Sequence, residues 1–288
     1  MASEEEAIST FVNNRNQKLR RWCLPEATSP KALCVFVHGV GDHILAYKPV
    51  AQVLWEKHNI ASCGFDQVGH GKSEGARVDI MDFQHYVDDL IQYIHMVKSE
   101  NPHITIFAVG HSMGGLVLGH ALLREADLVD GAVMYAAAIH ANPEVFTPFK
   151  VTMAKMLSYV FPSFPVGGIG DEALTRNKEE LERLRTDPLR RQGKLKARWG
   201  HHTINALVDF NSKMSQITVP VYIAHGGEDL VCHIDGSTKF RDTISSTDKT
   251  YKVYDKGYHR LHSEPDGLGE EFIEDMAQWM CSHIKSGQ

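Results

Sequence analysis

A serine between two glycines, in Gly110-His111-Ser112-Met113-Gly114, joins the apolar runs ITIFAVG and LVLGHAL. The first run has the length and β-branched content of a buried strand, and the second continues into a helix. A strand that turns at once into a helix strains the backbone at the turn, and side chains two positions to either side would collide there. The segment therefore predicts a sharp turn that exposes the Ser112 hydroxyl at a helix N-terminus, where the dipole favours developing negative charge.

Short apolar runs alternate with amphipathic helical stretches along most of the chain. The runs, which predict strands, are 32–38, 60–65, 104–110, 131–138, 219–226 and 250–256. The helical stretches are 47–58, 83–99, 113–124 and 270–285. This alternation predicts an α/β fold in which helices cover both faces of a mostly parallel central sheet. The length of 288 residues and the hydrophobic content of 43% are sufficient for one large core.

One interval interrupts the alternation. Residues 143–215 contain helical and loop patterns but no run typical of a strand. So long an interval between two buried strands predicts an insertion above the sheet. We therefore expect an α/β-hydrolase-type core formed by 1–142 and 216–288, with 143–215 as a helical cap or lid.

Composition and charge argue against several classes of protein. The chain has 30 basic and 36 acidic residues, so its net charge of −6 does not indicate a nucleic-acid partner. Its 17 histidines lack metal-ligand spacing, and we expect no metal site. The five cysteines are without CxxC spacing, which favours a reducing, intracellular compartment. The acidic N-terminus lacks a signal-peptide pattern, and no apolar run is long enough to span a membrane.

A nucleophilic serine needs a general base and an acid that orients the base, and in this kind of fold they follow in the order serine, acid, histidine. Asp229 follows the strand at 219–226 by a short glycine turn, which places it at the same sheet edge as Ser112. His259 lies just beyond the last predicted strand and is the candidate base. Asp235 is the alternative acid, although it can cap the next helix, and His262 is the alternative base.

The reaction also needs backbone donors for an oxyanion. The turn His38-Gly39-Val40-Gly41 follows the first predicted central strand, and its glycines let the chain bend away from the ladder. We expect the backbone N–H groups of Val40 and Met113 to form the oxyanion hole. His38 is expected to brace the loop by hydrogen bonding.

The motifs HGVGDH, FDQVGHGKSEG, GHSMGG, HANPE, TRNK, DPL and YHRLHSE occur in the order and approximate spacing of monoacylglycerol lipases of the α/β-hydrolase superfamily. The chain resembles this family from about Ala32 to its C-terminus. The resemblance implies a cytoplasmic, membrane-associating serine hydrolase that cleaves monoacylglycerol to fatty acid and glycerol without a cofactor. It supports the roles given above to Ser112, Asp229, His259, Val40 and Met113. It also implies that Asp42 and His262 help to hold the glycerol group.

The chain departs from the family pattern near this glycerol position. Asp42 stands where the family has a glutamate, Ala46 where it has an arginine, and Leu184 where it has a tyrosine. Missing hydrogen-bonding groups can change discrimination between substrates strongly. A lysophospholipase or a general carboxylesterase therefore remains an alternative, as does a ligand-binding hydrolase-fold protein with slow turnover.

The predicted insertion has two further features. Phe149, Met153 and Met156 recur at helical spacing, so they either pack on the core or line an acyl tunnel under a lid whose outer residues touch lipid. Segment 183–198 has seven basic residues and one acidic residue. Its charges either pair with the acidic residues that precede it or orient the tunnel mouth toward anionic lipid.

Overall fold

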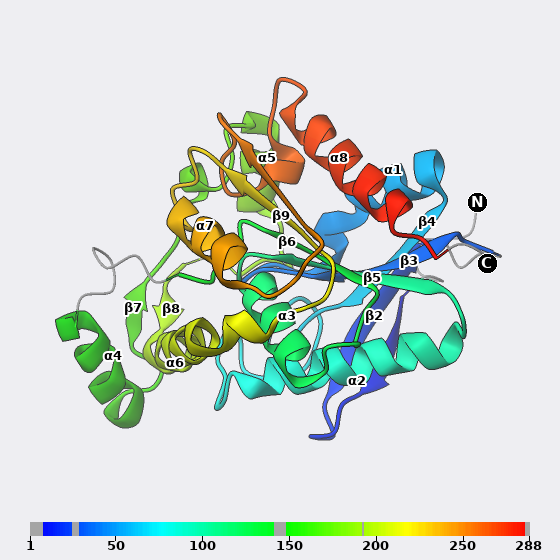
Figure 1. The fold of residues 1–288 in the computed structure, drawn as a ribbon. Helices are drawn as coiled ribbons and strands as arrows, with labels where there is room; N and C mark the ends of the chain where they lie inside the picture. Colours follow the sequence, from blue (N-terminus) through cyan, green and yellow to red (C-terminus); the bar gives the residue numbers. More distant parts are fainter. Residues whose placement is uncertain (1–7, 25–28, 141–147, 192, 286–288) are drawn as a thin grey trace.

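The computed structural model describes residues 8–24, 29–140, 148–191 and 193–285. Within them, one sheet has the strand order β1-β2-β4-β3-β5-β6-β9-β10 (Figure 1). Its strands are β1 (Ile8–Val12), β2 (Lys18–Leu24), β3 (Ala32–Val37), β4 (Ile60–Phe65), β5 (Thr105–His111), β6 (Gly131–Tyr135), β9 (Val221–Gly226) and β10 (Lys249–Tyr254). The part from β4 to β10 is parallel throughout, which confirms the predicted strands to within three residues at each end.

Burial explains why the parallel strands are so apolar. Every residue of β3, β4, β5, β6 and β9 is buried, because helices cover both faces of the sheet. One face carries α1 (Lys48–His58) and α8 (Leu268–Ser282), and the other carries α2 (Gln84–Glu100), α3 (Met113–Arg124) and α7 (Ile234–Thr243) (Figure 1). The fold is therefore the α/β arrangement that the sequence predicts.

The antiparallel edge of the sheet was not predicted. Strands β1 and β2 form a hairpin, and β2 pairs antiparallel with β4. The sequence of β2 is rich in charged residues and so does not indicate a strand of the sheet. In the structure Arg20 is buried, and its Nε lies 2.7 Å from Oδ2 of Asp66. A buried guanidinium is tolerated in a strand when a carboxylate pairs with it.

A long segment is inserted between β6 and β9, and we call residues 148–216 the inserted segment. It contains α4 (Pro148–Val160), β7 (Pro165–Gly167), α5 (Lys178–Thr186), β8 (Leu195–Lys196) and α6 (Ala197–Lys213). The helices were expected, whereas the small antiparallel pair of β7 and β8 was not. Short 3₁₀ helices are η1 (Ile44–Tyr47), η2 (Asp171–Ala173), η3 (Met214–Gln216) and η4 (Leu261–Ser263). Across the described ranges, no helix combines the length and the apolar character needed to cross a membrane.

Candidate active site

Ser112 lies at the sharp turn between β5 and α3, with φ 54° and ψ −123°. This positive φ is a strained conformation for a residue with a side chain. Its glycine neighbours allow the turn: a Cβ on Gly110 would lie 2.7 Å from Cα of Gly115, and one on Gly114 would lie 2.0 Å from the carbonyl oxygen of Val37. The close approach of these backbones explains the spacing seen in the sequence.

Gly114→Ala is expected to lower the free energy of unfolding by about 3 kcal/mol, because the new methyl group would overlap the backbone of β3. Urea denaturation measures this change. Gly167→Ala is the matched control, since a Cβ there meets nothing within 4 Å, and it should change stability by less than about 0.5 kcal/mol. Equal stability of the two variants would contradict the close approach at Gly114.

Asp229 and His259 meet at the carboxyl ends of β9 and β10. Nδ1 of His259 lies 2.8 Å from Oδ2 of Asp229, and both side chains are buried. The hydrogen bond occupies Nδ1 and leaves Nε2 of His259 as the ring atom that can accept a proton. His259 and Ser112 line the same cavity.

The loop after β9 fixes the carboxylate of Asp229 firmly. Its Oδ1 accepts hydrogen bonds from the N–H groups of Val231 (2.7 Å) and Cys232 (2.9 Å). Nε2 of His225 donates to the carbonyl of Cys232 at 2.9 Å and lies 3.4 Å from Oδ2 of Asp229. Burial raises the pKa of Asp229, but the charge of His259 and the hydrogen bonds from His225 and His259 outweigh it and hold this pKa well below its usual range. The carboxylate therefore stays ionised at any ordinary assay pH.

The two alternative residues are engaged elsewhere. The side chain of Asp235 is 72% exposed and lies 3.2 Å from His233, which caps α7, so the expected cap at Asp235 is instead the residue two positions before it. Nδ1 of His262 is 2.9 Å from the hydroxyl of Tyr135, and burial lowers the pKa of His262 well below its usual value. Of the candidates, His259 and Asp229 are the pair that the fold brings into contact.

The predicted oxyanion donors lie in two turns, the one that carries Val40 and the one that carries Ser112. Val40 lines it beside Ser112, and Met113 is the first residue of α3. Among the described residues, no backbone hydrogen bond uses the N–H of Val40 or Met113 as its donor. For Met113 the reason is that the first N–H groups of a helix have no partner within the helix. The oxyanion role of both groups stays a prediction. As predicted, His38 braces this region, because its Nε2 accepts the N–H of Gln67 at 2.9 Å.

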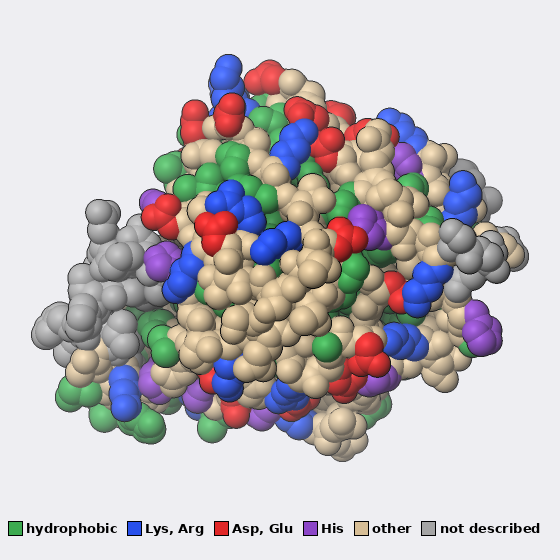
Figure 2. Space-filling view, viewed as in Figure 1, with side chains coloured by type: hydrophobic (Ala, Val, Ile, Leu, Met, Phe, Trp, Pro, Cys, Tyr) green, Lys and Arg blue, Asp and Glu red, His purple; other side chains and the backbone are tan. Residues whose placement is uncertain are grey.

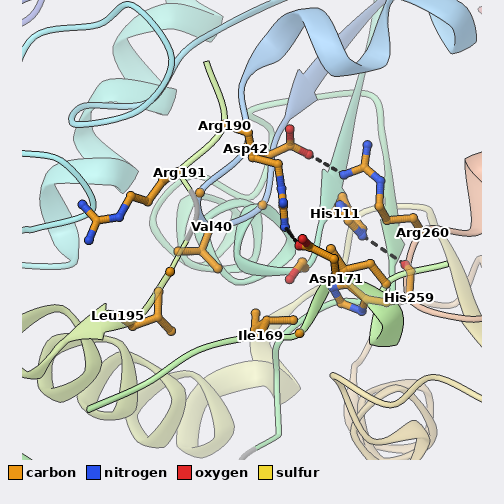
Figure 3. A pocket seen from close by; sticks show the side chains of 16 residues that line it. Val40, Asp42, His111, Ile169, Asp171, Arg190, Arg191, Leu195, His259 and Arg260 are labelled. Carbon is orange, nitrogen blue, oxygen red and sulfur yellow. Dashed lines mark hydrogen bonds and ion pairs between the residues drawn. The ribbon is translucent and has the colours of Figure 1, made fainter. Parts of the chain in front are cut away.

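The cavity, of about 270 Å³, lies between the carboxyl ends of the strands and the inserted segment. Figure 3 shows two ion pairs in its wall, Asp42 with Arg260 and Asp171 with Arg190. Asp42 therefore lies in the cavity wall, and its carboxylate pairs with an arginine that was not a candidate in the sequence. Its contact with a glycerol group stays a prediction. Ala46 is buried in η1, and the guanidinium beside Asp42 comes from Arg260.

His111 was also missed by the sequence analysis. Its Nε2 donates to the carbonyl of His259 at 3.1 Å, and its Nδ1 accepts from the hydroxyl of Tyr47 at 2.9 Å. The ring also stacks on Tyr135, with centroids 4.6 Å apart. His111 thus connects the strand that carries the serine to the loop that carries the histidine. Its position next to Ser112 was the only signal in the sequence.

The residues expected to line an acyl tunnel are less well defined. The side chains of Phe149 and Met153 lie outside the described residues. Met156 is 60% exposed on α4, and it is not among the residues that line the cavity. The tunnel assignment of all three stays a prediction.

Most of the basic side chains in segment 183–198 are paired with carboxylates. Those with acidic partners are Arg183, Arg185, Arg190, Lys196 and Arg198. The partners include Glu180 and Glu182 from the acidic run before the segment. Pairing reduces the positive electrostatic potential of this segment. It therefore favours the interpretation that these charges pair with acidic residues over the interpretation that they orient the tunnel mouth toward anionic lipid.

Comparison with known proteins identifies the family and the fold of the chain. Residues 28–266 match the family described as serine aminopeptidase, S33. The monoglyceride lipase of Rattus norvegicus is 33% identical, over 92% of this chain and 86% of the relative, and the monoacylglycerol lipase of Mycolicibacterium smegmatis is 28% identical, over 89% and 90%. The crystal structure of Paleococcus ferrophilus monoacylglycerol lipase is 25% identical, covers 92% of this chain and 99% of its own, and superposes with a TM-score of 0.81. The chain therefore belongs to the monoglyceride lipase family of α/β-hydrolases, a family of carboxylic ester hydrolases.

Proposed function

We propose that this protein cleaves monoacylglycerol to a free fatty acid and glycerol through an acyl-enzyme on Ser112. His259 takes the proton of Ser112 as its oxygen attacks the ester carbonyl, and the N–H groups of Val40 and Met113 hold the oxyanion. His259 then protonates the departing glycerol oxygen, and water releases the fatty acid by the same route. Asp229 keeps the imidazole in the tautomer that can accept the proton.

The observation that carries this proposal is the 2.8 Å contact between Asp229 and His259 beside the cavity that Ser112 lines. The order serine, acid, histidine and the turn at Ser112 are those of an acyl-transfer site in this fold. The names of the most similar relatives support an acylglycerol substrate.

The charges of the cavity wall favour a neutral leaving group. Asp42 and Asp171 are each paired with an arginine, while Arg191 extends away from His259 (Figure 3). Such pairs offer hydrogen-bond donors and acceptors with little net charge, which suits hydroxyl groups better than a phosphodiester. The cavity therefore supports monoacylglycerol over a lysophospholipid.

Steady-state hydrolysis of a long-chain monoacylglycerol, of lysophosphatidylcholine and of a short p-nitrophenyl ester tests the proposal. We expect the highest kcat/KM for monoacylglycerol. Turnover of the other esters alone would preserve the proposed mechanism but reject the substrate. Stoichiometric product release without turnover would favour the slow, ligand-binding protein.

We further propose that residues 143–215 act as a cap over a core of 1–142 and 216–288, and that this cap contacts membrane lipid peripherally from the cytoplasm. The support is a group of exposed hydrophobic side chains near the end of α4, at the lower left of Figure 2. Its members are Met156, Tyr159, Val160, Phe161, Phe164 and Val166. Exposed apolar and aromatic side chains that are gathered in one place are suited to the interfacial region of a bilayer.

Replacing Tyr159 and Phe161 together by serine is expected to weaken binding to phosphatidylcholine vesicles by about tenfold or more, because two aromatic side chains would no longer transfer from water to lipid. Vesicle sedimentation measures the affinity. Val12→Ser is the control, since Val12 is 49% exposed on β1, at the far edge of the sheet from β9 and β10. Unchanged binding of the double variant would reject this surface as the lipid contact.

A further inference from the structure

Arg260 follows the proposed base directly and contacts two other segments around the cavity. Its Nη1 donates to Oδ2 of Asp42 at 2.6 Å, and its Nη2 lies 3.2 Å from Oε1 of Glu180 on α5. Its backbone N–H donates to the carbonyl of Leu174 at 2.8 Å. Arg260 is only 3% exposed, so these contacts form inside the protein and not on its surface. One residue thus joins the loop of His259, the loop of Val40 and the inserted segment.

These contacts belong to a closed ring of polar and charged side chains. In order, the ion-pair ring consists of Asp42, Arg260, Glu180, Arg183, Asp187 and His43. Arg183 connects Glu180 (2.7 Å) to Asp187 (3.4 Å), and Asp187 lies 2.8 Å from Nε2 of His43. The backbone N–H of His43 donates to Oδ1 of Asp42 at 3.0 Å, which closes the ring.

Burial makes one pair of the ring restrictive, because the side chains of Arg260 and Asp42 are only 3% and 6% exposed. Separating a buried pair leaves an uncompensated charge away from water, so the protein is held in the arrangement that keeps this pair together. Burial raises the pKa of Asp42, but the charge of Arg260 outweighs it and holds this pKa well below its usual range. Asp42 therefore stays ionised and paired with Arg260 at ordinary assay pH.

The position of Asp42 matters because it is two residues from Val40. Its N–H donates to the carbonyl of Gly39 at 3.3 Å, so Asp42 closes the turn that presents the N–H of Val40. An oxyanion donor acts only when it lies within a few tenths of an ångström of its productive position. A displacement of Asp42 would therefore be transmitted to the proposed oxyanion hole.

We propose that Arg260 is a positioning residue, which fixes the loop of Val40 relative to His259 and connects both to α5 of the inserted segment. This inference rests on the proposed function, since it concerns the same nucleophile and the same donors. Arg260 acts on the reaction through Asp42 and through the main chain of its neighbour, His259.

A direct contact with the leaving group is the other role open to Arg260, because it lines the cavity and its Nε has no hydrogen-bond partner among the described residues. The two roles predict different substrate dependence. Loss of a glycerol contact affects only esters that carry glycerol and raises KM. Loss of positioning lowers kcat for every ester, since all of them need the oxyanion hole.

The experiment measures kcat and KM of Arg260→Met and Asp42→Asn with a long-chain monoacylglycerol and with a short p-nitrophenyl ester. We expect kcat to fall about 10²-fold for both esters in each variant, with KM changed by less than about threefold. The double variant should show no further loss, because both changes open the same ion pair. Arg260→Lys should recover part of kcat, since an ammonium group still pairs with Asp42.

Arg198→Met is the matched control. Arg198 also connects the inserted segment to the core, with Nη2 2.7 Å from Oδ2 of Asp79, but it does not line the cavity. It should keep kcat within about twofold of the wild type, a limit smaller than the usual effect of misplacing a reacting group. An equal loss in Arg198→Met would show that any weakening of the contact between core and inserted segment lowers activity, and would overturn the specific role of Arg260.

Two other results would also overturn the inference: unchanged kcat in Arg260→Met, or a loss confined to the glycerol ester. If Arg260→Met does not fold, as judged by thermal melting, Arg260→Lys and Asp42→Asn provide the same comparison between the two esters. The proposed substrate is tested separately. If the wild type cleaves only the p-nitrophenyl ester, the proposed function fails, yet the ratio of kcat values for that ester still tests Arg260.

Discussion

Ser112→Ala is expected to reduce turnover of every ester by at least about 10⁴-fold, because alanine has no oxygen that can form the acyl-enzyme. The fold should be unaffected, since no hydrogen bond of the Ser112 side chain holds the turn between β5 and α3 as its cap. Steady-state kinetics measures the loss, and a thermal melting curve verifies that the variant is folded. The residual rate should come from binding and from the oxyanion donors alone.

A second measurement makes this prediction specific. An active-site titrant, such as a fluorophosphonate, should label the wild type once per chain and leave Ser112→Ala unlabelled. Ser73→Ala is a suitable control and should still be labelled once per chain. Ser73 is buried on another loop, where its hydroxyl accepts the N–H of Arg20 and donates to the carbonyl of Asp66. Labelling of the Ser112→Ala protein, or turnover within tenfold of the wild type, would mean that another residue is the nucleophile.

The sequence predicted best where a segment has one buried face or is buried on all sides. The predicted bounds of β4 and α3 agree with the structure, at 60–65 and 113–124. Both segments are mostly apolar and are followed directly by a charged residue, Asp66 or Glu125, so the local pattern and the burial in the fold indicate the same bounds.

The sequence did not predict the structural role of a charged residue whose partner is distant in the chain. Arg20 belongs to a strand because Asp66, 46 positions later, neutralises it. Arg260 is separated from Asp42 by 218 positions and from Glu180 by 80. No local pattern reveals such pairs. The sequence therefore indicated the candidate acid, base and serine from their places in the fold, but not the residues that contact them from distant segments.

Asp229→Asn is expected to lower kcat by about 10⁴-fold while leaving the positions of the backbone nearly unchanged. The reason lies in three groups that contact the carboxylate, the N–H groups of Val231 and Cys232 and Nδ1 of His259. Oδ1 accepts two N–H groups, from Val231 and Cys232, so the oxygen of asparagine would take that side. The amide NH₂ would then face Nδ1 of His259, which becomes the acceptor, and the ring proton would move to Nε2. An imidazole protonated at Nε2 cannot take the proton of Ser112.

Rotating the asparagine side chain does not relieve this conflict. The opposite orientation would direct the NH₂ group at the two N–H donors of Val231 and Cys232, and leaving those buried donors unpaired would cost more than the exchange of tautomer at His259. Asp235→Asn is the control, because this exposed carboxylate was the alternative acid, and it should retain full kcat. If Asp235→Asn lost activity and Asp229→Asn kept it, the proton relay through His259 would have to be assigned to a different acid, despite the 2.8 Å contact with Asp229.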